Sequence, residues 1–572
     1  MTSAESFNRF DPKPFYRQRG WLIGDGAVGG KARGLAFAHA ALEGAEEVRS
    51  LVGFPELTYV VSTEIFDEFL AMNNLRELVD QSDDYNDILE QFENALLPPA
   101  LAPVLAAISE RIPVPIAVRS SSILEDDTIL SFAGKYATRF FGNTGSPEYR
   151  LKRIERAIKQ VFASTFNPSA REYQRKHGIE PHREKMAVLI QPIVGRRRGS
   201  WYYPEFAATA YSKVFRRPSP RINKDDGVMR VCFGLGTRTV DRVFARTFYL
   251  TNPNLRAEGN RPGDIFAHSQ EEFDYVDLEH GFFLTGRVEF ALAEIMKHHK
   301  FAPAFIEWYD GNMFHWLHTD IRGMDTPRPA FTFADFPRRC GALFRTTRRL
   351  LALFEQEMGL PADMEMVYES DPGELTLVQL RPLSTFEDLG RVVIPPYIPE
   401  NHLILRGNRM VANGLLRHVS HLVYVDPDIY GQQADFYEVA RGIGAINAKL
   451  EGERYILVGP GRWGSTNPAL GVPTLYNEIS NCGCLVELGI PSRGMTPELS
   501  YGTHFFLDLD VDNILYLPVF DGASGNIYAK TWFDTAPYAL GDHPSIRIYK
   551  GNFDVFLDGE EEIGVIIENP SP

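Results

Sequence analysis

Alternating apolar and polar positions predict two neighbouring strands in the second half of the chain. The first covers 364–368 and the second covers 375–381, with a short polar turn between them. Two such runs around a short turn favour an antiparallel hairpin.

Four polar side chains would share one face of this hairpin. Asp363 and Glu365 are two residues apart, so a strand points both carboxylates to the same side. Gln379 and Arg381 share a side for the same reason. Hard oxygen ligands beside a fixed cation are what a magnesium–nucleotide complex requires. A solvated strand face with an ordinary ion pair gives the same pattern, so the hairpin alone leaves both interpretations open.

The rest of the chain mixes helical and extended patterns. Helical spacing of apolar residues marks 65–112, 147–162, 288–297 and 336–358. Short apolar runs predict strands at 115–119, 186–194, 205–214 and 228–233. The fold class is therefore expected to be α/β (α+β).

A proline-rich stretch sets the clearest domain boundary. Residues 386–401 contain Pro395, Pro396 and Pro399, which make a stiff extended connector. We expect a large domain over 1–385 and a smaller α/β domain over 402–572. In the smaller domain the patterns predict helices at 407–417 and 432–449, strands at 421–425 and 455–458, and a β-rich end from 513.

Composition sets limits on function and location. The chain has 572 residues and a net charge of −16, which argues against a nucleic-acid-binding surface. Four cysteines are too few for a disulfide framework, and Cys482 and Cys484 are expected to be buried thiols rather than a metal or redox pair. The sequence shows neither a leader pattern nor an apolar run of about 20 residues, so we expect a cytoplasmic protein without membrane partners.

Two segments are candidates for phosphate contact. Gly29 and Gly30 precede an apolar helix, where small residues let the backbone approach an anion and Lys31 adds a charge. The pattern GxxxxGK[ST] is absent, and a glycine turn at a helix start explains the same residues. Arg119 ends an apolar strand, where a guanidinium is costly unless it binds an anion or pairs with a carboxylate such as Glu125.

Six short motifs in this order resemble the nucleotide-binding domain of phosphoenolpyruvate synthase and pyruvate phosphate dikinase, an ATP-grasp fold shared with rifampin phosphotransferase and glucan water dikinase. They are Gly29-Gly30-Lys31, Ala117-Val118-Arg119-Ser120-Ser121, Ser131-Phe132-Ala133-Gly134, Gly234-Leu235-Gly236, Asp363-Met364-Glu365 and Gln379-Leu380-Arg381-Pro382. The resemblance spans almost all of 20–385 and implies a two-part ATP-grasp domain, with subdomains of about 20–180 and 180–385.

The resemblance implies roles for residues that hold the nucleotide. Lys31 and Arg119 would contact the phosphates of ATP, and Gly134 would lie in the loop over them. The adenine pocket would be lined by Gln191, Ile193 and Val194. From the residues alone, 188–194 is an apolar strand whose edge could offer backbone groups to a base, although most such strands are only core strands.

The resemblance also assigns the hairpin. Glu365 and Gln379 would hold Mg²⁺, with Asp363 nearby as a nucleotide-binding residue. Arg381 would stabilise the transferred phosphoryl charge and, together with Arg119, would be catalytic. This assignment agrees with the cation-and-carboxylate face expected from the strand pattern.

Several departures from the family pattern limit what it implies. An acidic residue usually follows Gly-Leu-Gly, but Thr237 stands there, which puts the ribose contact in question. Residues 242–323 form a long, unusual segment. Its histidines His315 and His318 are three apart, and we expect them to be packed surface residues rather than metal ligands. No phosphohistidine motif is found after the connector, and a pyruvate-binding barrel cannot fit in the remaining residues.

The smaller domain offers a candidate acceptor site. A glycine-rich loop follows the strand at 455–458 and carries Arg462 and Ser465, which suit an anion. His504 lies between a glycine-rich turn and an apolar strand. One hypothesis makes these three residues an acceptor site, with His504 as phosphoryl carrier or general base. The alternative is a structural Gly-Pro-Gly corner and a turn histidine bonded to backbone.

The sequence thus predicts an ATP- and Mg²⁺-dependent phosphotransferase of kinase or dikinase type. The acceptor, a small molecule or a protein, is not identified, and His504 could carry the phosphoryl group to it. One alternative is a non-catalytic ATP-binding regulatory or scaffold protein. Another is a subunit that works with a phosphohistidine domain on a separate chain. The sequence does not set the oligomeric state, and a homodimer is one option.

Overall fold

The structure is a computed structural model. It describes residues 4–570 apart from 83, 123–124, 126–135, 177–183, 215–220, 240–244, 257–260, 325, 384–391, 433–434, 465–469, 476–477, 491–508 and 510–513. Contacts divide the chain into two units. The first contains Met1–Lys213 and Asp225–Ser384, and the second contains Val214–Lys224 and Thr385–Pro572.

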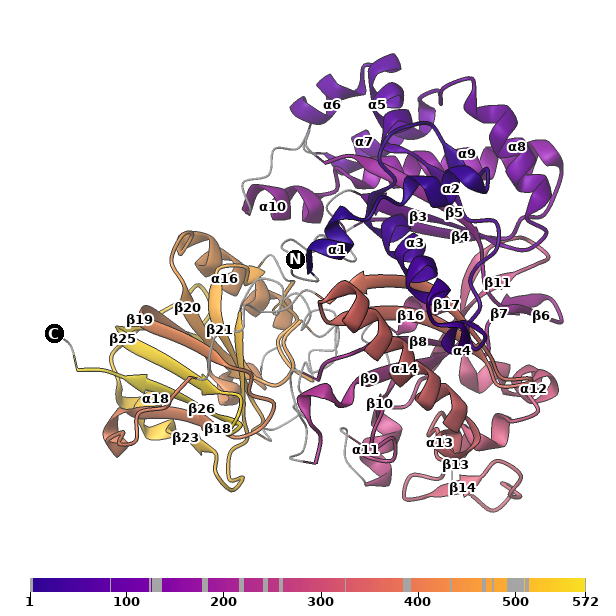
Figure 1. Ribbon diagram of the computed structural model, residues 1–572. Coiled ribbons are helices and arrows are strands. Elements are labelled where there is room, and N and C mark those ends of the chain that lie inside the picture. Colours follow the sequence, from indigo (N-terminus) through magenta and orange to yellow (C-terminus); the bar gives the residue numbers. More distant parts are fainter. Residues whose placement is uncertain are drawn as a thin grey trace. The chain divides into compact units, whose positions relative to one another are not determined.

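One sheet of the first unit is built largely from the N-terminal part of the chain. Its order is β1 (Leu22–Ile23), β2 (Tyr59–Val61), β5 (Met186–Pro192), β3 (Ile116–Ser122) and β4 (Thr138–Phe141). Around it lie α3 (Gly29–Glu43), α5 (Thr63–Met72), α7 (Tyr85–Asn94), α8 (Leu101–Arg111) and α9 (Pro147–Ser164) (Figure 1). The apolar stripe expected at 147–162 is buried, with Ile154, Ile158 and Val161 at 0% exposure.

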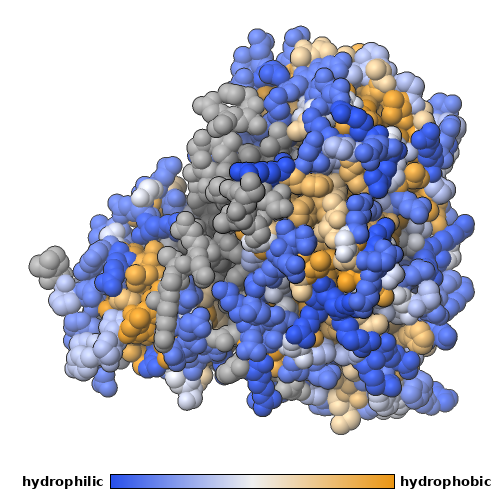
Figure 2. Space-filling model, in the orientation of Figure 1, coloured by the Kyte–Doolittle hydropathy of each residue, from blue (hydrophilic) through white to orange (hydrophobic). Residues whose placement is uncertain are grey.

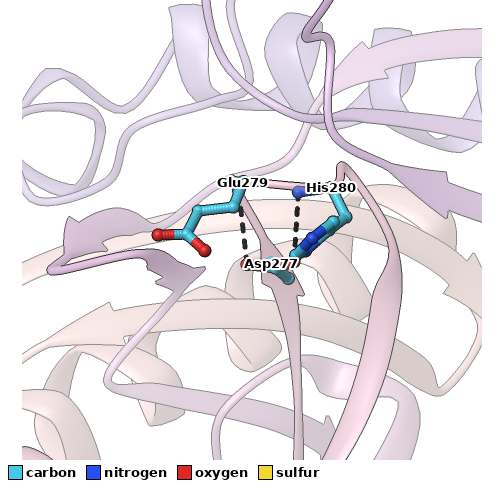
Figure 3. A group of neighbouring side chains, drawn as sticks. All are labelled: Asp277, Glu279 and His280. Atoms are coloured by element: carbon cyan, nitrogen blue, oxygen red, sulfur yellow. Dashed lines mark hydrogen bonds and ion pairs between the residues drawn. The ribbon is translucent and has the colours of Figure 1, made fainter.

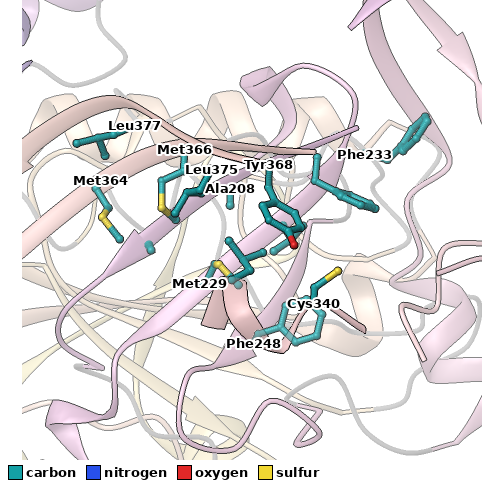
Figure 4. Close-up of a cluster of buried hydrophobic side chains, with 14 of the residues drawn as sticks. Ala208, Met229, Phe233, Phe248, Cys340, Met364, Met366, Tyr368, Leu375 and Leu377 are labelled. Carbon is teal, nitrogen blue, oxygen red and sulfur yellow. The ribbon is translucent and has the colours of Figure 1, made fainter. Parts of the chain in front are cut away.

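A second sheet of this unit is antiparallel throughout. Its order is β10 (Arg246–Tyr249), β9 (Val228–Phe233), β8 (Phe206–Tyr211), β16 (Ala362–Glu369) and β17 (Glu374–Pro382). Its apolar face carries Met229, Met364 and Met366, which Figure 4 shows within one buried cluster. Helix α14 (Gly341–Met358) packs on that face, since Thr347 contacts the sulfurs of Met229 and Met366.

Two smaller sheets complete the first unit. One is β12 (Phe283–Arg287), β11 (Glu272–Asp277), β7 (Trp201–Tyr203) and β6 (Arg196–Arg198). The other is β14 (Phe314–Trp316), β13 (Glu307–Tyr309) and β15 (Arg328–Ala330). Helix α12 (Val288–His298) lies between β12 and β13 along the chain, and α13 (Phe336–Arg339) follows β15.

The second unit is a mixed sheet with helices. Strands β22 (Leu515–Val519), β21 (Cys482–Leu488), β20 (Tyr455–Pro460) and β19 (Gly414–Val425) pair in parallel. The order then continues antiparallel through β25 (Ile546–Asp558), β26 (Ile563–Glu568), β18 (Leu403–Gly407) and β23 (Ile527–Tyr528). Helix α16 (Phe436–Lys449) begins after Asp435, whose side chain accepts from the backbone N–H of Tyr437 at 2.9 Å.

The α/β arrangement expected of this unit is confirmed, but the helix expected at 407–417 is wrong. Residues from Gly414 onward belong to β19, where Leu415 pairs with Phe556 and Leu416 pairs with Val555. Pairing with a strand far along the chain outweighs the local spacing of apolar residues. Gly407 leaves no room for a side chain, because a Cβ there would lie 2.3 Å from the carbonyl oxygen of Pro518.

The surface and the helices complete this description. The face drawn in Figure 2 is largely hydrophilic, with separate hydrophobic patches. Among the described residues, none of the helices has the length and apolar character needed to cross a bilayer. The mixed α/β fold class expected from the sequence is confirmed.

Candidate functional site

The hairpin of β16 and β17 brings together the four polar side chains singled out in the sequence. Asp363 lies directly opposite Arg381, and Glu365 lies directly opposite Gln379. Residues opposite one another in an antiparallel pair point to the same face. The predicted convergence of two carboxylates, an amide and a guanidinium is therefore confirmed.

The same register extends the polar character across the sheet. Glu365 lies opposite Thr209 of β8, Thr209 lies opposite Arg230 of β9, and Arg230 lies opposite Thr247 of β10. Together with Gln379, these residues form one polar row over five strands. The other face of the sheet is apolar and buried. The sheet therefore has one face for packing and one face suited to a polar ligand.

Arg119 connects the two sheets of the first unit at this row. Its Nη2 donates to Glu365 Oε2 at 2.9 Å and to Gln379 Oε1 at 2.6 Å. The side chain is 11% exposed, so both hydrogen bonds are shielded from water. Glu125, considered from the sequence as a partner for Arg119, pairs with a different cation.

That cation is Lys31, at the start of helix α3. Its Nζ donates to Ser120 Oγ at 3.1 Å and to the Glu125 carboxylate, and both charged side chains are largely buried. Gly29 has φ +76°, and a Cβ there would lie 1.6 Å from the carbonyl oxygen of Ser121. The glycine therefore lets the helix start directly against β3.

Helix α3 also crosses the second sheet at close range. A Cβ on Gly34 would lie 1.8 Å from the carbonyl oxygen of Leu380 in β17. One helix is thus fixed by two glycine contacts, to β3 at one point and to β17 at another. This position sets Lys31 near the row that contains Glu365, and the Lys31 charge contributes to lowering the Glu365 pKa.

Asp363 is a buried carboxylate, and one of its two oxygens accepts no hydrogen bond from the described residues. Its Oδ2 accepts from Arg381 Nε at 2.6 Å, while Oδ1 accepts no hydrogen bond from any described residue. The residue is 1% exposed, and burial raises its pKa although the Arg381 charge opposes this. A buried oxygen without a donor is costly, and a bound cation would satisfy it.

Glu365 is held in its ionised form. Burial would raise the pKa, but the charges of Arg119, Arg381 and Lys31 outweigh burial and lower it below the ordinary value of 4.5. Its Oε2 and the Oε1 of Gln379 converge on one nitrogen atom of Arg119. Together with Asp363 they form a set of oxygen donors that fits Mg²⁺.

The residues expected to line an adenine pocket lie at the end of β5 and just after it. Gln191 is buried, and its Nε2 donates to Thr58 Oγ1 at 3.1 Å. The N–H of Ile193 donates to Pro115 at 2.8 Å, and its carbonyl accepts from the hydroxyl of Tyr202 at 3.0 Å. The Gln191 side chain and the Ile193 N–H are thus used inside the protein, and Val194 is partly exposed.

Three of the predicted site residues lie outside the described residues, namely Gly134, Ser465 and His504. Arg462, the remaining acceptor candidate, lies in a tight corner of the second unit. Its N–H donates to the carbonyl of Leu470 at 2.9 Å, and Gly461 bridges to Gly471. The acceptor hypothesis therefore stays a prediction.

Sequence reasoning missed a buried acid at that corner. Glu487 of β21 is 0% exposed and accepts from the N–H of Trp463 at 3.0 Å and from the hydroxyl of Tyr516 at 2.6 Å. An acidic residue inside an otherwise apolar strand was the available signal. Its hydrogen bonds anchor the residue that follows Arg462.

A second missed acid lies beside the Gly234-Leu235-Gly236 loop. Asp274 of β11 is 3% exposed, accepts from Thr237 Oγ1 at 2.6 Å, and accepts from the N–H of Leu235 through its backbone carbonyl at 3.0 Å. Asp274 therefore places an acidic side chain beside Thr237, the position at which the family pattern usually has an acid. Nothing local in the sequence pointed to it, because it is 37 residues away from Thr237.

The histidines of 242–323 have structural partners. His315 Nε2 lies 2.7 Å from Asp310 Oδ2, and His299 is buried between Tyr203 and Glu205. The tyrosine and the glutamate each bond one ring nitrogen of His299, which offsets the free-energy cost of burying the imidazole.

A cluster of two acids and a histidine lies at the end of β11, and Figure 3 shows its members Asp277, Glu279 and His280. The Asp277 carboxylate accepts from the backbone N–H groups of Glu279 and His280 at 3.2 and 3.1 Å, and lies 2.6 Å from His280 Nδ1. These bonds are those of a turn closed by an aspartate.

Comparison with known proteins finds one family match, which covers most of the first unit. Residues 25–394 match the family described as pyruvate phosphate dikinase, AMP/ATP-binding domain. A phosphoenolpyruvate synthase of Aquifex aeolicus is 28% identical over 198 residues, which cover 31% of this chain and 21% of that protein. A rifampicin phosphotransferase of Streptomyces sviceus is 37% identical over 95 residues, which cover 17% of this chain and 10% of that protein. The chain therefore matches only a minor part of the length of these relatives.

Proposed function

Because the chain belongs to the pyruvate phosphate dikinase AMP/ATP-binding domain family, we propose that it is an ATP- and Mg²⁺-dependent phosphotransferase. The observation that carries this proposal is the position of Arg119. Its guanidinium donates to Glu365 and Gln379 through one nitrogen atom, so the cation proposed to bind phosphate contacts two oxygens proposed to hold the metal.

The nucleotide would be held by charges that the fold already places. Lys31 and Arg119 would contact the phosphates, and Asp363, Glu365 and Gln379 would hold Mg²⁺. The metal ion, when bound, supplies positive charge that neutralises the phosphate oxygens. Arg381, fixed by its bond to Asp363, would stabilise charge on the transferred group. Phosphoryl transfer depends mainly on such positioning and neutralisation.

The acceptor is the finer part of the proposal. A phosphoryl group would pass to His504, to a small molecule or protein held near Arg462 and Ser465, or onward in dikinase fashion. In this view 402–572 takes the place of the phosphohistidine and pyruvate domains. The glycine-rich corner around Arg462 supports an anion site in the second unit.

Product analysis tests the reaction class. Purified protein is incubated with ATP and Mg²⁺, and ADP, AMP and phosphate are quantified. ADP supports a kinase, whereas AMP with phosphate supports a dikinase. Tight ATP binding without turnover would favour the regulatory or scaffold alternative. Turnover that appears only after a phosphohistidine-domain protein is added would favour the subunit alternative.

The Glu365→Gln variant checks the site itself. It keeps the side-chain size but removes the charge that a metal requires, so turnover should fall to background. An unchanged rate would rule out the proposed metal site. Glu374→Gln on the same hairpin is the matched control, since Glu374 is 62% exposed and bonds Arg196.

The remaining parts of the proposal concern setting and assembly. A reducing cytoplasm suits the four free cysteines, all of which are buried. A homodimer is the assembly to be tested by light scattering after size-exclusion chromatography.

A further inference from the structure

A cavity of about 210 Å³ lies beyond the end of strand β16 that is farther from Asp363. Ser370, which directly follows β16, lines it. Asp363 lies near the other end of the strand, seven residues or roughly 23 Å away at about 3.3 Å per residue. The cavity is therefore separate from the proposed nucleotide site.

We propose that this cavity binds a small aromatic carboxylate. The proposal goes beyond the phosphotransferase function and does not depend on it. Three features favour that class of ligand: the aromatic walls, the positive charge at the edge of the cavity, and the absence of acidic side chains among its described lining residues.

The walls are aromatic and already packed against one another. Four phenylalanines line the cavity, namely Phe206, Phe301, Phe305 and Phe336. The ring of Phe206 meets those of Phe305 and Phe336 edge-on, with centroids 5.0 and 4.9 Å apart. Apolar cavities of about 150 Å³ in proteins accept benzene, so this one has room for a ring with a substituent.

Cations lie around one of these rings. The guanidinium of Arg339 lies 5.2 Å from the centre of the Phe301 ring. Lys300 Nζ lies at the same distance from that ring, but it is also paired with Asp371 Oδ2 at 3.9 Å. Arg339 itself lines the cavity and is 46% exposed. It bonds Asp335 through Nε at 3.1 Å, so among the described contacts its two terminal nitrogens remain for a ligand.

Asp335 does not cancel this charge. It is also bonded by Arg338 through two bonds of 2.6 Å, so one carboxylate serves two guanidinium groups. At the Arg339 edge of the cavity, the guanidinium groups of Arg338 and Arg339 carry one more charge than Asp335, which favours an anionic ligand there. A carboxylate matches the planar geometry of a guanidinium.

The other polar lining groups are neutral. Ser370 donates its hydroxyl proton to Glu205 Oε2 at 2.5 Å, and Glu205 lies 3.1 Å from His299 Nδ1. The serine is therefore fixed and cannot donate that proton to a ligand. Burial raises the pKa of the Cys340 thiol to about 12, so it adds no negative charge near neutral pH. Arg339 is thus the charged donor of the described lining.

Isothermal titration with sodium benzoate and with benzamide tests the proposal on the full chain. Both probes have the same ring, but only benzoate is charged. Wild-type protein should bind benzoate about tenfold more tightly than benzamide, the effect expected of one charge-assisted hydrogen-bond pair. Arg339→Gln should remove this preference while leaving benzamide binding unchanged.

Three comparisons make the test specific. Arg338→Gln is the matched control, because Arg338 shares Asp335 but does not line the cavity, and it should keep the preference. Ala304→Phe should fill the cavity and abolish binding of both probes without changing ATP binding. Glu365→Gln should bind benzoate as the wild type does. The proposal is overturned if wild-type protein binds neither probe, if Arg339→Gln keeps the preference, or if Glu365→Gln loses benzoate binding.

Discussion

The guanidinium of Arg119 lies 2.9 Å from the carboxylate of Glu365, which follows it by 246 residues in the chain. This ion pair joins β3 of one sheet to β16 of the other within the first unit. It combines a structural contact with the centre of the proposed site, so the two roles can be separated by variants.

Replacing Arg119 by alanine should destabilise the first unit as well as stop turnover. Both partners are mostly shielded, so losing hydrogen bonds to charged groups should cost about 1–3 kcal/mol of unfolding free energy. Urea denaturation measures the loss. In a double-mutant cycle with Glu365→Gln, the two costs should not add, because they report on the same contact. Full additivity would contradict the pair.

The stability that Glu365 contributes should depend on pH. Its folded-state pKa is lowered, so its contribution is present above the unfolded pKa and is lost as pH falls through the folded value. The difference in unfolding free energy between wild type and Glu365→Gln should therefore be largest near neutral pH. It should shrink as the pH falls below about 4.5. Denaturant curves from pH 7 to pH 3 measure it, and a constant difference would contradict the lowered pKa.

Metal affinity should depend on the unsatisfied oxygen of Asp363. Asp363→Asn can still accept the bond from Arg381 but loses the negative charge that faces a cation. Mn²⁺ affinity in the presence of ATP, followed by electron paramagnetic resonance, should fall at least about tenfold. Glu374→Gln should bind Mn²⁺ as the wild type does. Equal affinity in both variants would show that Asp363 does not face the metal.

The close contact of α3 with β17 should make Gly34 intolerant of a side chain. A Cβ at Gly34 would lie 1.8 Å from a backbone oxygen, so Gly34→Ala should cost about 1–3 kcal/mol or more as the helix shifts. Gly44→Ala provides the control, because nothing lies within 4 Å of a Cβ there. Thermal unfolding distinguishes them. Weaker ATP binding in Gly34→Ala would accompany the shift, because Lys31 moves with the helix.

Contacts within the hairpin could be predicted from the sequence, whereas contacts between distant segments could not. The pairing of Asp363 with Arg381 follows from strand period and a short turn. The partners of Arg119, and the approach of Asp274 to Thr237, arise from packing of strands that are far apart in the chain. Local spacing carries no information on such pairs.

The helix wrongly predicted at 407–417 has the same origin. Leu415 and Leu416 fit either a helix or a strand by spacing, and the pairing of β19 with β25 decides between them. The candidate acceptor residues differ, since two of the three lie outside the described residues. Motif order nevertheless identified the family correctly, because it combines six weak local signals into one specific pattern.

The second unit is continuous with the first at more than one place in the chain. Residues Val214–Lys224 belong to it, although the first unit continues again from Asp225. Cutting the chain after Ser384 would therefore remove the rest of the unit to which this segment belongs. The side chains of Lys213 and Asp225 form an ion pair at 2.6 Å, and the N–H of Val214 donates to the carbonyl of Lys224 at 2.7 Å. A turn of about two to four residues could therefore replace the segment between Val214 and Lys224. To produce the first unit alone, the chain would have to be closed across Val214–Lys224 as well as cut after Ser384.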